Sequence, residues 1–185
     1  MQVALVERAR AGDEEAFASL ARAAGDRLLA IAYRILRDLG LAEDAVQQTL
    51  VLAWRELPSL REPDRFDAWL RRLLVNACYR EARRGRQRAT NIRALPVEEP
   101  ARGDDYETVV ARDQLDRGFR RLPTEQRAVF VFHHYLGLTL IEVAAELGVP
   151  LGTVKSRLHY ATNTLRAALE ADMRGTVNSS REHSA

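Results

Sequence analysis

The 185-residue chain has a single cysteine, Cys78, which excludes an internal disulfide and any cysteine-based zinc site. No uninterrupted apolar run approaches the roughly 18 residues that a bilayer span requires. Met1 is not followed by the basic and then apolar pattern of a signal peptide. We therefore expect a cytoplasmic protein without direct membrane insertion.

Glycine and proline are scarce, with 10 and 6 residues, and the period-2 alternation of β-strands is hard to find. Ala, Leu, Arg and Glu dominate, and all four favour helices. The predicted fold class is all-α, with two small helical domains joined by a flexible linker. Because the net charge is only +2, any nucleic-acid signal must come from where the charges lie.

Patterns of catalysis and metal binding are also missing. His133 and His134 are adjacent, so they point to different helix faces, and no Cys, Asp or Glu stands at ligand spacing around them. The chain has no glycine-rich phosphate loop and no nucleophile elbow. We expect no enzyme activity, no metal and no cofactor.

The clearest motif is a helix-turn-helix between Thr139 and Leu165. Thr139 and Glu142 have the spacing of a capping box that begins a helix. Gly148 can end that helix in the left-handed conformation, and Pro150 suits the start of the next one. An ordinary helical hairpin is the alternative reading of this pattern.

The second helix of this motif separates an apolar stripe from a polar face. Val154, Leu158, Ala161 and Leu165 follow helical spacing and predict the buried side. Polar and cationic side chains lie opposite or on the flanks, as suits a helix in a DNA major groove. The candidate DNA-binding residues are Lys155, Ser156, Arg157, His159 and Tyr160.

The first domain is predicted over residues 1–88, with helices broken at Gly12-Asp13, by a loop at 58–65, and ending in a basic tail. Aromatic residues interleaved with arginines suit single-stranded DNA. Asn76 falls seven residues after Trp69 and can offer a donor and an acceptor to a displaced base. The competing interpretation is that Phe66, Trp69 and especially Trp54 are core residues.

The remaining boundaries follow from composition. Prolines and acidic residues predict a flexible acidic linker over 89–108, a second helical domain over 109–172, and a disordered polar tail over 173–185.

Four stretches together resemble the extracytoplasmic-function sigma factors of RNA polymerase, which belong to the sigma-70 family. They are GDEEAF, AEDAVQQTLVLAW, RFDAWLRRLLVNACYREARR and LPTEQRAVFVFHHYLGLTLIEVAAELGVPLGTVKSRL. Their order matches sigma regions 2 and 4 without a region 3, so the resemblance covers nearly the whole chain.

The resemblance implies a role for each stretch. Asp44, Gln47 and Gln48 would bind the clamp helices of core polymerase. The minus-ten element would be read and opened by the segment from Leu60 to Asn76, with Asn76 at a flipped base and the loop near Leu60 to Arg65 forming the pocket for that base. The residues assigned to it are Leu60, Arg61, Arg65, Phe66, Trp69, Asn76 and Arg80.

The helix-turn-helix would then read the minus-35 element. Two residues depart from the family pattern: Gln48 stands where glutamate is usual, and Tyr160 where a basic residue is more common. The resemblance also implies an anti-sigma protein as a partner. The alternative function is a stand-alone helix-turn-helix transcriptional regulator, which would bind an operator as a dimer without polymerase.

Overall fold

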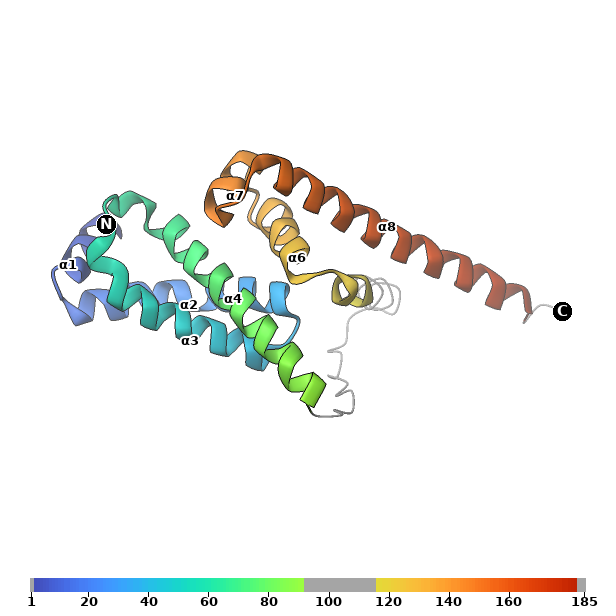
Figure 1. Ribbon diagram of the computed structural model, residues 1–185, viewed down its shortest axis with the longest axis horizontal. Coiled ribbons are helices and arrows are strands. Elements are labelled where there is room, and N and C mark those ends of the chain that lie inside the picture. The colour runs from blue at the N-terminus through green and yellow to red at the C-terminus, as the bar shows by residue number, and fades with distance from the viewer. Residues whose placement is uncertain (1, 92–115, 183–185) are drawn as a thin grey trace.

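The computed structural model describes residues 2–91 and 116–182, and within these ranges every regular element is a helix, which confirms the all-α prediction (Figure 1). The first unit contains α1 (Gln2–Arg10), α2 (Glu14–Leu36), α3 (Leu39–Glu56), the short 3-10 helices η1 (Leu57–Ser59) and η2 (Pro63–Arg65), and α4 (Phe66–Asn91). The second unit contains a helical segment at 116–121, α6 (Thr124–Phe130), the π-helical turn η3 (Val131–Tyr135), α7 (Leu140–Leu147) and α8 (Leu151–Glu182).

Local capping determines where the helices of the first unit begin. Asp13 accepts a hydrogen bond from the Ala16 backbone N–H, and Asp38 accepts one from the Leu41 N–H, so α2 and α3 each begin behind an aspartate. Arg37 adopts a left-handed conformation with φ of 58°, which turns the chain sharply from α2 into α3. The two helices then pack beside each other and against α4.

The helix-turn-helix is confirmed in the predicted register. Thr139 and Glu142 form a complete capping box at the start of α7, and Gly148 ends that helix with φ of 66°. Val154, Ala161 and Leu165 of α8 are buried, as the stripe predicted, and Leu158 is half-buried. In the described ranges, no helix combines the length and apolarity of a membrane span.

Two helices extend further than the sequence predicted. α4 continues to Asn91 rather than ending near Arg84, and α8 continues to Glu182, so residues 173–182 are helical where we expected disorder. Mainly strong helix formers follow Leu165 as far as Arg174, and no proline comes after them, whereas the next six residues, 175–180, are weak helix formers. Most of the predicted linker at 89–108, the first part of the domain predicted to start at 109, and residues 183–185 lie outside the described residues.

The two units pack against each other. α7 lies on α4, and α6 contacts both α2 and α4. Val129, Phe132 and Val143 of the second unit belong to the same hydrophobic core as the buried residues of α2 and α4. In Figure 1 the long helix α8 leaves this junction and projects away from the first unit.

Gly148→Ala should destabilise the protein by about 1–2 kcal/mol, because alanine is strained at positive φ. Its Cβ would also lie 3.3 Å from Arg72. Gly25→Ala is the matched control, since Gly25 lies inside α2 with open space around its Cβ position, and it should stabilise by about 0.5–1 kcal/mol. Urea unfolding measures both, and equal stabilities would contradict the prediction.

Candidate nucleic-acid and protein interfaces

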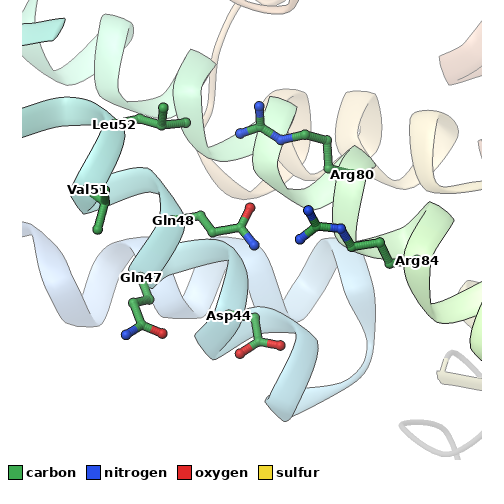
Figure 2. Close-up of a pocket in the computed structure, with 7 residues that line it drawn as sticks. All are labelled: Asp44, Gln47, Gln48, Val51, Leu52, Arg80 and Arg84. Carbon is green, nitrogen blue, oxygen red and sulfur yellow. The ribbon is translucent and has the colours of Figure 1, made fainter. Parts of the chain in front are cut away.

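An open groove of about 400 Å³ runs between α3 and α4 (Figure 2). Arg80 and Arg84 reach from α4 toward α3, and Gln48 reaches across from α3. Asp44 and Gln47 are exposed beside them. The groove is lined by Asp44, Gln47, Gln48, Val51, Leu52, Arg80 and Arg84. It brings together all three residues predicted to bind polymerase, and it also includes Arg80, which we had assigned to DNA.

Two residues that line the groove bind Glu81 of α4, whose side chain is almost completely buried. Gln48 Nε2 donates a hydrogen bond to Glu81 Oε1 at 2.6 Å, and Arg84 Nη1 pairs with the same oxygen at 2.7 Å. A buried carboxylate requires such partners. Gln48 is therefore turned inward and engaged, so it is less available to a partner than Asp44 or Gln47.

This contact gives a physical reason for glutamine at position 48. A glutamate there would place a second carboxylate against Glu81, where the amide now donates. The sequence prediction did not include Glu81. The sequence pattern does indicate that Glu81 is buried, because it follows Ala77 and Cys78 at helical spacing on the apolar stripe of its helix.

The residues assigned to minus-ten binding divide into buried and exposed groups. Leu60 and Phe66 are buried in the core, so their side chains pack inside the first unit, and their assignment to the minus-ten element stays a prediction. Trp69 is half-buried and packs on Phe66 with ring centroids 5.8 Å apart. Periodicity could not separate a core aromatic residue from a base-stacking one, since both recur at helical spacing.

Arg61, Arg65 and Asn76 are exposed, as a DNA-binding role requires. Arg65 forms a surface ion pair with Glu62 at 2.5 Å. Asn76 shares one face of α4 with Arg72 and Arg80, four residues away on either side. We call Arg72, Asn76 and Arg80 the α4 polar stripe.

Trp54 is more exposed than its sequence pattern predicts. It was expected in the core, yet 36% of its surface is exposed, and its ring packs against Phe17 at 5.0 Å. Val51, one helical turn earlier, is 54% exposed. α3 therefore presents apolar as well as polar surface beside the groove.

The outer face of α8 carries the residues predicted for the minus-35 element. Lys155, Ser156, His159 and Tyr160 are exposed, and Tyr160 reaches 62%. His159 is held by Asn163, with 2.9 Å between Nε2 and Nδ2. Arg157 differs, because it is half-buried and close enough to Tyr79 of α4 to lower the pKa of that phenol, against the larger effect of burial, which raises it to about 12.

Comparison with known proteins shows that family models match both helical units. The sigma-70 region 2 model matches residues 20–88, and a sigma-70 region 4 model matches residues 112–165. Together the two matches cover most of the chain, including α4 and the helix-turn-helix.

Individual relatives agree with this assignment. The chain is 33% identical to the ECF RNA polymerase sigma factor SigE of Mycolicibacterium smegmatis, over 91% of this chain and 68% of that protein. It is 34% identical to SigL of Mycobacterium tuberculosis, over 86% of this chain and 94% of the relative. Among solved structures, it is similar to CnrH in complex with the cytosolic domain of CnrY, with a TM-score of 0.63, 29% identity, and coverage of 92% of this chain and 98% of the other.

A second solved structure is the sigma factor RpoE in complex with the anti-sigma factor NepR from Bartonella quintana. The TM-score is 0.64 and the identity 26%, over 80% of this chain and 92% of that one. The chain belongs to the extracytoplasmic-function sigma factors of RNA polymerase. As a member of this family it binds core RNA polymerase and directs promoter-specific transcription initiation.

Gln48→Glu should destabilise the protein by about 1–3 kcal/mol at pH 7, because Glu81 loses a donor and gains a like charge. The control is Gln47→Glu, exposed on the same helix, with an expected change within about 0.5 kcal/mol. Urea unfolding at pH 7 measures the stability of both variants, and equal losses of stability would contradict the prediction.

Proposed function

We propose that three faces of the chain perform promoter recognition, the first two of which adjoin at Arg80. Asp44 and Gln47, with the groove between α3 and α4, bind core polymerase. The α4 polar stripe and the exposed arginines before it bind the minus-ten element. The outer face of α8 binds the minus-35 element. The exposure of these faces on two helical units, matched to regions 2 and 4, is the observation that carries the proposal.

In the minus-35 face, base reading and phosphate binding fall to different side chains. Ser156 Oγ donates to the Thr153 carbonyl oxygen at 3.0 Å and can accept from a base edge, and the exposed ring of Tyr160 suits a thymine methyl group. Lys155 and Arg157 supply cations for phosphates. His159, fixed by Asn163, offers a further polar contact on the same face.

In the minus-ten face, Asn76 offers both a donor and an acceptor to an unstacked base. Arg61, Arg65 and Arg80 supply positive charge around it, and Trp69 offers the exposed part of its ring. Leu60 and Phe66 act from the core, by holding the loop and the start of α4 in place. Flipping a base requires a few kcal/mol of unstacking, which these contacts offset.

In the polymerase face, a carboxylate and an amide on exposed helix surface suit a basic, polar partner helix. Val51 and Trp54 add apolar area next to them. Gln48 contributes through the architecture of the groove, because its amide is already bonded to Glu81.

Joining the two DNA readers on one chain makes the second contact effectively intramolecular once the first has formed. Each small unit neutralises only a few phosphates, so neither binds duplex DNA tightly alone at physiological salt.

Polymerase supplies the chemistry, and this chain works as a non-enzymatic specificity factor in the cytoplasm. CnrH was solved in complex with the cytosolic domain of CnrY, and RpoE in complex with the anti-sigma factor NepR. We therefore propose that this chain also binds an anti-sigma partner.

The alternative, a stand-alone helix-turn-helix regulator, predicts tight dimeric binding to a palindrome without polymerase. It leaves the region 2 match and the groove between α3 and α4 without a role.

Run-off transcription with core polymerase and a library of genomic fragments tests the proposal. The wild-type chain should produce promoter-specific transcripts, and the double variant Asp44→Arg, Gln47→Arg should lose both the transcripts and co-purification with core. Glu7→Arg is the control, because Glu7 is exposed on α1, away from the groove. If the chain yields no promoter-specific transcript from any fragment, the proposal fails.

The two DNA faces should be separable with polymerase present. Asn76→Ala should weaken binding of a single-stranded minus-ten oligonucleotide roughly tenfold, while leaving a minus-35 duplex unaffected. Lys155→Ala should do the reverse, with a shallower salt dependence on the duplex. Fluorescence anisotropy at several salt concentrations measures both, and the assignment is wrong if either variant weakens both DNAs equally.

A further inference from the structure

The contact between α4 and α7 contains a nearly buried ion pair. Arg71 Nε donates to Glu146 Oε2 at 2.8 Å, and Arg71 Nη2 donates to Oε1 at 2.5 Å. The side chains are only 16% and 9% exposed. The bidentate bond raises the pKa of Arg71, and its parallel geometry is the one by which arginine also binds a phosphate.

Other contacts join the units at the far end of the same interface. Arg127 of α6 donates to the carbonyl oxygen of Leu36 at 3.2 Å, at the carboxyl end of α2. Arg37 pairs with Asp116. The guanidinium of Arg34 lies 3.9 Å from the centre of the Tyr135 ring.

The interface also contains unfavourable polar burial, so it is suited to opening. Burial, with Arg37 and Arg86 nearby, lowers the pKa of Arg127 to about 10. Three buried polar atoms at the contact lack a hydrogen-bond partner among the described residues: Nε of Arg37, Nε of Arg127 and the hydroxyl of Tyr79. Each such group reduces the stability of the closed arrangement.

The closed arrangement engages cations of both DNA readers. Arg71 lies in the part of α4 that also carries the polar stripe, and the turn at Gly148 lies against Arg72. Arg157 of the recognition helix is half-buried near Tyr79. Closure therefore withholds positive charge from DNA on two helices at once.

We propose that Glu146 occupies on Arg71 the place of a DNA phosphate, so that the free protein is closed and binds promoter DNA weakly, and that Arg71 becomes a DNA contact when the two units separate. This inference rests on the proposed function of α4. It adds a DNA-binding residue, Arg71, and assigns to Glu146 the role of its intramolecular competitor.

The test compares Glu146→Gln, Arg71→Gln, the double variant and the control Glu7→Gln in the full-length protein without polymerase. Glu7→Gln makes the same change in net charge on exposed α1 surface. The probe is a fork-junction DNA with a single-stranded minus-ten region from a promoter that the wild-type protein transcribes. Cooperative urea unfolding confirms that each variant is folded.

Glu146→Gln should raise DNA affinity roughly threefold to tenfold and steepen the salt dependence by about one counterion. Arg71→Gln in the same chain should remove both gains, and Glu7→Gln should change affinity less than about twofold. The idea is overturned if Glu146→Gln binds like Glu7→Gln, or if its gain survives Arg71→Gln.

A distance measurement keeps the test informative if Glu146→Gln folds poorly. Spin labels at Val3→Cys and Ile141→Cys report the separation of the units, since both sites are exposed and Cys78 is buried. The charge swap Arg71→Glu, Glu146→Arg should keep the wild-type distance, whereas Arg71→Glu alone should lengthen it. Equal distances in all three proteins would show that the Arg71–Glu146 ion pair does not hold the units together, and would refute this inference. Failure of wild-type transcription would instead refute the proposed function.

Discussion

The apolar stripe of α4 fixes the orientation of that helix about its own axis. Most of the functional surface depends on this orientation. Leu70, Leu74, Ala77 and Cys78 are buried against the first unit. With these residues inward, Asn76 must point to solvent, Glu81 must enter the space beside α3, and Arg71 must face α7. Thus one packing constraint places a base-reading amide, a buried carboxylate and an interdomain ion pair on three sides of one helix.

Local signals predicted local structure well. The capping box at Thr139, the left-handed Gly148 and the stripe from Val154 to Leu165 each act within one helix or turn, so the sequence contains the whole interaction. The N-cap of α2 by Asp13 was visible for the same reason. The all-α class follows from such signals repeated along the chain.

Contacts between distant segments were not visible in the same way. Gln48 and Glu81 are 33 residues apart, and Arg71 and Glu146 are 75 apart, so no periodicity links them. Aromatic residues were the other difficulty, since Phe66 is buried and Trp54 is partly exposed, although both recur at helical spacing. Which of the two is covered depends on neighbouring helices that the local pattern does not specify.

The Gln48–Glu81 contact also has a consequence for engineering and for divergence within the family. Residues on two different helices share one part-buried hydrogen bond, so they are constrained as a pair rather than singly. A chimera that takes α3 from a relative with glutamate at this position would need the matching α4 as well. The exchangeable module of region 2 is therefore the helix pair, because a junction between α3 and α4 would separate Gln48 from its partner Glu81.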